Sequence, residues 1–197
     1  MNDNLKDEKW SENVILVDGD YVDKVAFDLI VNFERMIGRR IPKADIARWI
    51  DCIALDGGVR EGEQQSQVVL IHDKQHLQMD NFTPGDYEQN LNGKAFKDNL
   101  GEFTVSSLPI ETIAGGDNLF MESLSAVCAR KEVKRIMIVP NAETMYDKVR
   151  ETLHYVDDDD KRITVFAMQP MPGGNFRQEI LGYSLMNALG IKSDEIK

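Results

Sequence analysis

Short runs of consecutive apolar residues alternate along the chain with longer segments in which apolar residues recur every three or four positions. A run without polar alternation is typical of a strand covered on both faces, as in a parallel sheet. The sequence therefore predicts parallel strands joined by helical crossovers. Five strands are predicted, over residues 14–17, 67–72, 103–106, 135–139 and 163–167.

The segments between these runs carry apolar stripes at helical spacing. The first stripe begins after Tyr21 and ends at Gly38, a residue favoured at helix C-termini. Trp49 lies beside the second stripe, and we expect it at the edge of the core. Helices are predicted over residues 22–37, 43–55, 117–131 and 176–189, with another after 140–143 and a short one over 87–91. Strands alternating with helices predict an α/β fold, a three-layer α/β/α sandwich with a mostly parallel five-stranded sheet.

The length of 197 residues fits one domain. Residues 1–12 are polar and predict a flexible tail, and residues 13–197 predict a single α/β domain on which the turn and helix of 170–197 pack. No apolar run approaches the roughly 20 residues that span a bilayer. The N-terminal residues have no signal-peptide pattern, and Cys52 and Cys128 are expected as buried thiols. We therefore expect a cytoplasmic protein with no membrane contact.

The net charge of the chain limits the classes of molecule that it is expected to bind. The chain has 34 acidic and 23 basic residues, a net charge of −11. Such a surface repels a phosphate backbone over the Debye length, roughly 8 Å at physiological salt. Broad, sequence-independent binding of nucleic acid is therefore not favoured, although a local basic rim would still permit a specific contact.

Asp18 and Asp20 follow the first apolar run directly, within the stretch Val-Asp-Gly-Asp-Tyr. Open α/β sheets bind their ligands at the carboxyl ends of the strands, which is where Asp18 is expected. Aspartate is also favoured at the N-terminus of a helix, where it caps free N–H groups and interacts well with the helix dipole. The two residues alone do not separate a site from a helix cap.

If the five strands are parallel, polar residues from several of them meet at one edge of the sheet. Asp117 opens a later helix and can lie in the loop layer above this edge. Hard cations such as Mg²⁺ take oxygen ligands and keep several waters, so two or three carboxylates suffice. The residues expected at this edge are Asp18, Asp20, His72, Asp73, Ser106, Asn141, Glu143 and Gln169.

Three short motifs occur in a characteristic order: Val-Asp-Gly-Asp at 17–20, Ala-Gly-Gly-Asp at 114–117 and Val-Pro-Asn-Ala-Glu at 139–143. This order resembles the PIN-like superfamily of metal-dependent ribonucleases, specifically its NYN branch. The resemblance implies that Asp18 and Asp117 bind Mg²⁺ or Mn²⁺ and that RNA is the substrate.

The third motif departs from the family pattern. Asn141 and Glu143 stand where the family has a Ser-Gly-Asp run and a further aspartate, and Asp20 stands where it often has Asn. The implied catalytic set is then Asp18, Asp117, Asp20 and Glu143, with Asp20 as a third metal ligand. Lys24 and Asn141 are the implied substrate contacts, and Lys74 or Arg177 could also touch phosphate.

Two alternatives stay open. A catalytically inactive PIN-like domain, acting as a homodimer or as a protein-interaction module, would keep the fold while its third motif decays. A haloacid dehalogenase-type phosphohydrolase is suggested only by the Asp-Gly-Asp at 18–20, and Tyr21 follows where Thr or Val is expected. No glycine-rich phosphate loop is present, so nucleotide binding of that kind is unsupported.

Overall fold

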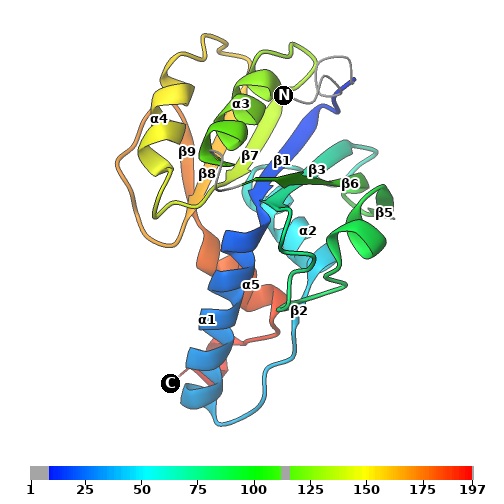
Figure 1. Ribbon diagram of the computed structural model, residues 1–197, viewed down its shortest axis with the longest axis vertical. Helices are drawn as coiled ribbons and strands as arrows, with labels where there is room; N and C mark the ends of the chain where they lie inside the picture. Colours follow the sequence, from blue (N-terminus) through cyan, green and yellow to red (C-terminus); the bar gives the residue numbers. More distant parts are fainter. Residues whose placement is uncertain (1–8, 112–115, 197) are drawn as a thin grey trace.

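A seven-stranded sheet forms the centre of the molecule (Figure 1). The computed structural model describes residues 9–111 and 116–196, with the side chains of residues 116 and 117 left out. The strands run in the order β5-β6-β3-β1-β7-β8-β9, and every neighbouring pair is parallel except β5 and β6. They are β1 (Asn13–Asp18), β3 (Gln65–Asp73), β5 (Lys94–Asp98), β6 (Gly101–Ile110), β7 (Arg135–Val139), β8 (Arg162–Ala167) and β9 (Arg177–Ile180).

Within the described residues, five α-helices cover this sheet: α1 (Gly19–Ile37), α2 (Ile46–Asp56), α3 (Gly116–Cys128), α4 (Tyr146–His154) and α5 (Leu181–Ala188). The two short strands β2 (Ala44–Asp45) and β4 (Phe82–Thr83) form a separate parallel pair. A π-helical turn, η2 (Tyr87–Leu91), matches the short helix predicted there, and a 3-10 turn, η4 (Ser193–Glu195), ends the described chain.

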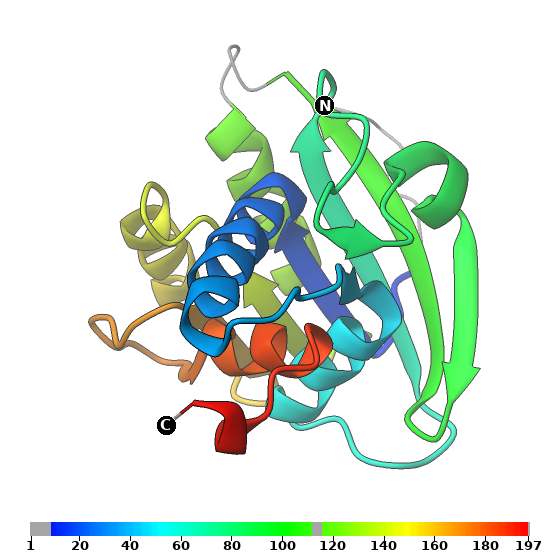
Figure 2. The ribbon, with the colours of Figure 1, turned by 90° about the horizontal axis from the view of Figure 1, so that it is seen from below.

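The side chains of β1 alternate between two hydrophobic clusters, because successive strand residues point to opposite faces. Ile15 and Val17 pack with residues of α1, α2 and α5. Val14 and Leu16 pack with residues of α3 and α4. All four side chains are fully buried. Figure 2 shows α1, α2 and α5 together, with α3 and α4 behind them. The predicted α/β class is therefore confirmed.

The prediction of five strands is wrong, since the sheet formed by the described part of the chain has seven. The two additional strands are its edges, β5 and β9, whose sequences are largely polar. An edge strand is covered incompletely and needs no apolar run, so the pattern that marks central strands does not mark it. The helix predicted over 176–189 accordingly begins only at Leu181, after β9.

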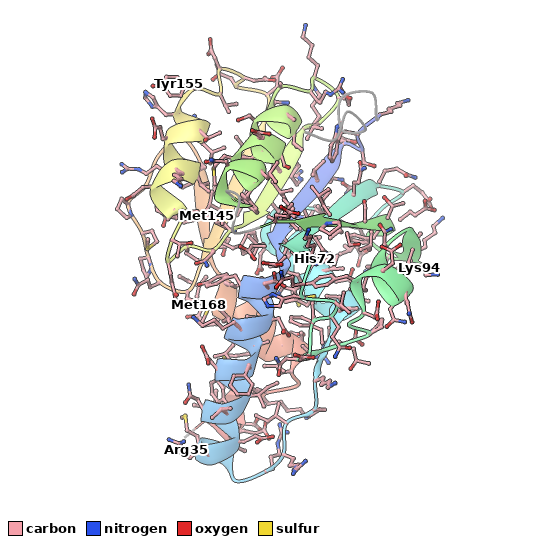
Figure 3. All side chains as sticks on the ribbon, in the orientation of Figure 1. Arg35, His72, Lys94, Met145, Tyr155 and Met168 are labelled. Carbon is pink, nitrogen blue, oxygen red and sulfur yellow. The ribbon has the colours of Figure 1, made fainter. Side chains whose placement is uncertain are left out.

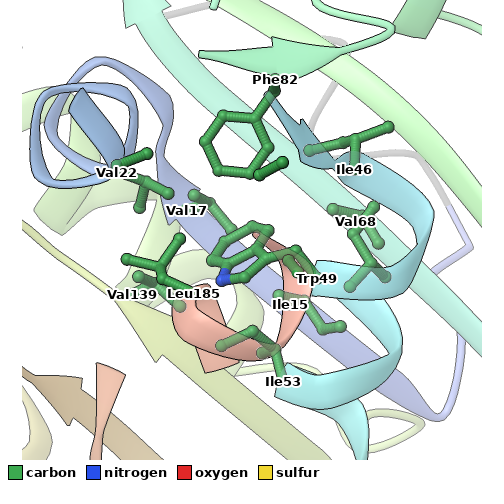
Figure 4. Packing of buried hydrophobic residues seen from close by; sticks show 14 of the residues in the cluster. Ile15, Val17, Val22, Ile46, Trp49, Ile53, Val68, Phe82, Val139 and Leu185 are labelled. Carbon is green, nitrogen blue, oxygen red and sulfur yellow. The ribbon is translucent and has the colours of Figure 1, made fainter. Parts of the chain in front are cut away.

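Two other predictions differ from the structure, in the length of a strand and in the burial of a side chain. The predicted strand at 103–106 is β6, which has ten residues. Trp49, expected at the edge of the core, is fully buried within it, as Figure 4 shows. Its indole packs edge-on against Phe82, with ring centroids 5.7 Å apart.

The predicted N-terminal tail lies mostly outside the described residues. Of its last residues, Trp10 is buried in the cluster that contains Val14. The carbonyl of Glu12 accepts hydrogen bonds from the N–H groups of Lys134 and Arg135, at 2.8 and 3.1 Å. The packed part of the chain therefore includes Trp10. Among the described helices, none combines the length and the apolar character needed to cross a membrane.

Candidate functional site

The order in which the chain adds strands to the sheet reverses direction at the central strand β1. From β1 the chain leads through α1 and α2 to β3 on one side, whereas β7 on the other side is reached through β6 and α3. Asp18 pairs with Ile71 of β3, and Val17 pairs with Val139 of β7. Ligands of open α/β sheets bind outside the carboxyl ends of the strands at such a switch point. Asp18 therefore stands where a ligand site is expected.

Asp18 is also the N-cap of α1. Its Oδ1 accepts the backbone N–H of Tyr21 at 3.0 Å. Burial, followed by the charges of Glu143 and Asp18, raises the pKa of the Tyr21 phenol to about 12. Two carboxylates, one from the end of β1 and one from the segment after β7, thus act on the same phenol. The capping and site hypotheses for Asp18 are compatible in this geometry.

The segment after β7 carries the predicted residues Asn141 and Glu143. Asn141 Oδ1 accepts the N–H of Glu143 at 3.1 Å, which fixes the turn. The Glu143 carboxylate lies 3.7 Å from Lys24 Nζ on α1, and their side chains are 64% and 63% exposed. Such an exposed ion pair contributes little to stability. It does bring the predicted catalytic carboxylate and the predicted phosphate contact together.

Asp20 has its contacts on the other side, at the end of β3. Its Oδ2 accepts the N–H of Asp73 at 2.6 Å and lies 3.1 Å from His76 Nδ1. Its Oδ1 accepts the Tyr87 hydroxyl proton at 3.2 Å. Gly19 permits this approach, because a Cβ there would lie 2.5 Å from the Tyr87 hydroxyl oxygen. Asp20 thereby joins α1 to the loop between β3 and β5.

His72 is buried at the same junction, where Figure 3 places it near the start of α1. Its ring stacks on that of Tyr87, with centroids 3.7 Å apart and planes 7° apart. Its Nδ1 lies 2.9 Å from the carbonyl oxygen of Asp73 and 3.0 Å from that of His76. Since both partners only accept, Nδ1 carries the proton. His72 therefore has a structural role here.

Replacing Asp20 with alanine is expected to lower the free energy of unfolding by about 2 kcal/mol, because it removes the acceptor for Asp73 and Tyr87. Urea unfolding followed by circular dichroism measures this change. The matched control is Asp28→Ala, since Asp28 is exposed on the same helix. Equal stability of the Asp20 and Asp28 variants would contradict a structural role for Asp20.

Asp117 lies in the first turn of α3, but its side chain is outside the described residues. Its predicted proximity to Asp18 therefore stays a prediction. Within residues 9–111 and 116–196, excluding the side chains left out, no three or more His, Cys, Asp or Glu residues form a group that could hold a metal ion. The binding of Mg²⁺ or Mn²⁺ likewise stays a prediction.

The contacts of Asp20 with Tyr87 and His76 were not predicted. The only signal was the concentration of polar residues at the end of β3 and directly after it, at His72, Asp73 and His76. Comparison with curated proteins finds no match, and comparison with solved structures finds none either. A family model matches residues 7–196, nearly the whole chain. The chain therefore belongs to DUF6621, a family of unknown function.

Proposed function

We propose that the protein is a metal-dependent ribonuclease of the PIN-like type, built as a three-layer α/β/α sandwich, whose third acidic motif is reduced to Asn141 and Glu143. One observation carries the proposal: Asp18 ends the central strand at the switch point of the sheet, and its charge and that of Glu143 act on one phenol. This is the position at which α/β folds gather ligand-binding groups.

The residues have the chemistry that the reaction needs. In this proposal the carboxylates of Asp18 and Asp117 hold Mg²⁺ or Mn²⁺, which prefer oxygen ligands. A cation held there would supply an activated water and charge stabilisation at the phosphoryl oxygen. Glu143 orients the attacking water, while Lys24 and Asn141 contact the phosphate. Because Asp20 accepts bonds from Asp73 and Tyr87, we assign it the positioning of α1 rather than direct ligation.

A catalytically inactive PIN-like domain that binds proteins is the second candidate. It is supported by the structural use of the same groups: Asp18 caps α1 and Glu143 pairs with Lys24. A carboxylate that caps a helix or forms an ion pair would be retained in evolution even in a protein without catalytic activity. The two candidates differ in one measurable respect, which is metal-dependent cleavage of RNA.

The test is cleavage of labelled single-stranded RNA in Mg²⁺ or Mn²⁺ by the purified protein and by Asp18→Asn. Asparagine caps a helix as well as aspartate does, so the variant should fold while losing the charge. We expect at least a roughly 100-fold loss of rate, since changes outside the ligand shell alone cost about 10- to 100-fold. Asp117→Asn should give the same loss.

Asp28→Asn is the control, since it removes the same charge from an exposed position on α1. It should cleave RNA at the rate of the unmodified protein, and chelation of the metal should stop cleavage. If the unmodified protein cleaves no faster than Asp18→Asn, the carboxylates are structural and the inactive candidate replaces the ribonuclease.

A further inference from the structure

A groove of about 870 Å³ lies between α1 and the loop that follows β3. Hydrogen bonds hold both of its walls in place. Asp23 of α1 accepts the N–H groups of Asp80 and Asn81 in the loop, at 3.1 and 2.8 Å. Asp20, one turn earlier, contacts His76 at 3.1 Å. The groove is therefore preformed, and a ligand would not have to order the loop.

Two large apolar side chains line the groove without being buried. Phe27 of α1 is 52% exposed and Leu77 of the loop is 71% exposed. One turn further along α1, Val31 is 38% exposed and extends the apolar surface. Neighbouring exposed apolar residues rimmed by polar groups are typical of interaction sites. The groove thus offers apolar contacts at both walls.

The charged side chains of the lining are mainly acidic. Asp20, Asp23, Asp80 and Asp86 line the groove, against the basic groups of Lys24 and His76. Lys24 is paired with Glu143, and His76 is paired with Asp20. These pairings leave an excess of negative charge in the groove.

The hydrogen bonds to two of these carboxylates come from uncharged donors. Asp80 accepts from the amide of Gln78 at 2.8 Å, and Asp86 accepts from the backbone N–H groups of Glu88 and Gln89 at 3.1 and 2.8 Å. Uncharged donors leave the formal charges uncompensated. An acidic groove on a chain of net charge −11 attracts cations and repels a second copy of the chain.

We propose that this groove binds a basic, amphipathic polypeptide segment of a partner protein. Its Lys or Arg side chains would meet Asp80 and Asp86, and its apolar side chains would pack on Phe27 and Leu77. The volume of about 870 Å³ accommodates several side chains. The inference goes beyond the proposed ribonuclease and does not depend on it.

The probe is a fluorescein-labelled peptide of twelve residues in which Lys and Leu alternate, and binding is followed by anisotropy at roughly 0.15 M salt, where the Debye length is about 8 Å. The double variant Asp80→Asn/Asp86→Asn should weaken binding about 10-fold, since each surface charge pair contributes a few-fold. Asparagine at position 86 keeps the cap of η2. Phe27→Ser/Leu77→Ser should weaken binding by a similar factor, because both side chains are exposed and their loss spares the core.

The matched control is Asp157→Asn/Asp159→Asn, which removes the same charge from exposed positions in the loop before β8. It should change peptide affinity by less than about twofold, since screening isolates distant charges. An equal loss in the control would mean nonspecific attraction and overturn the proposal. A Lys and Ser peptide that binds equally well, or the absence of saturable binding by the Lys and Leu peptide, would also overturn it.

A single-stranded RNA of twenty nucleotides serves as a competitor. It should not displace the peptide, because the proposed peptide contacts are Phe27, Leu77, Asp80 and Asp86 and do not include Lys24; displacement would assign the groove to nucleic acid instead. The Asp80→Asn/Asp86→Asn variant should cleave RNA at the unmodified rate if the protein is a ribonuclease, because neither residue belongs to the proposed catalytic set. Failure of peptide binding and failure of the ribonuclease proposal are therefore separate results.

Discussion

Replacing Trp49 with alanine is expected to lower the free energy of unfolding by about 3–5 kcal/mol, the usual cost of removing a large aromatic side chain from a core. Trp49 is fully buried, and its Nε1–H donates to Ser184 Oγ of α5 at 3.1 Å. Phe82 packs edge-on against it at an interplanar angle of 68°. The indole thus joins α2, α5 and the β2-β4 pair (Figure 4).

Urea unfolding followed by circular dichroism measures this loss, since removing an indole complicates fluorescence. Two variants separate the contribution of apolar packing from that of the indole hydrogen bond. Trp49→Phe keeps most of the apolar volume and should cost less than the alanine variant. Ser184→Ala removes the acceptor and should cost about 1–3 kcal/mol, because it leaves a buried indole N–H without its partner. A loss below about 1 kcal/mol for Trp49→Ala would mean that the core closes around the gap.

The strands at the centre of the sheet could be predicted, whereas those at its edges could not. β1 and β7 are covered on both faces, so burial requires uninterrupted apolar runs such as Val14 to Val17. β5 and β9 lie at the edges and carry polar residues, since their outer sides have no neighbouring strand. The residues of β9 were predicted to begin a helix. That prediction was wrong because backbone pairing with β8 overrides the helix-like spacing of the apolar residues in this segment.

For the candidate site, the sequence predicts which residues follow the ends of the strands, but not which residues far apart in the sequence contact each other. Asp18 and Glu143 were assigned to one edge of the sheet because strand ends can be predicted. The hydrogen bond between Asp20 and Tyr87 joins residues 67 positions apart, and Tyr87 begins the short turn η2 in a segment whose apolar residues have no regular spacing. Trp49 was assigned to the core edge because it lies beside the apolar stripe of its own helix, and no local pattern shows that Phe82 of β4 covers it. Contacts of this kind leave no local pattern.

The stability of the protein is expected to fall as the pH rises from about 4 to 7, and Asp51→Asn should remove much of this fall. Burial, followed by the neighbouring carboxylate of Asp98 and the charge of Asp45, raises the pKa of Asp51 to about 7. Its Oδ1 is buried and accepts no hydrogen bond from the part of the chain that the structure describes. Asp98 ends β5, so the pair lies where α2 meets the sheet.

The sign follows from proton binding. Between the usual pKa of 3.8 and the raised value of about 7, the folded protein binds a proton at Asp51 that the unfolded chain releases. Rising pH therefore favours the unfolded chain until Asp51 ionises in the folded state. The full shift corresponds to about 4 kcal/mol, which screening of the partly exposed group reduces to about 1–2 kcal/mol.

Urea unfolding of the unmodified protein and of Asp51→Asn at pH 5 and pH 8 tests this expectation. Relative to the unmodified protein, the variant should gain about 1–2 kcal/mol of stability between pH 5 and pH 8, because Asp51 is ionised in the unfolded chain at both pH values but ionises in the folded protein only between them. Burial also raises the pKa of Asp23 and Asp56, but these groups are present in both proteins and cancel in the difference. A variant with the same stability difference at both pH values would show that Asp51 does not titrate between them.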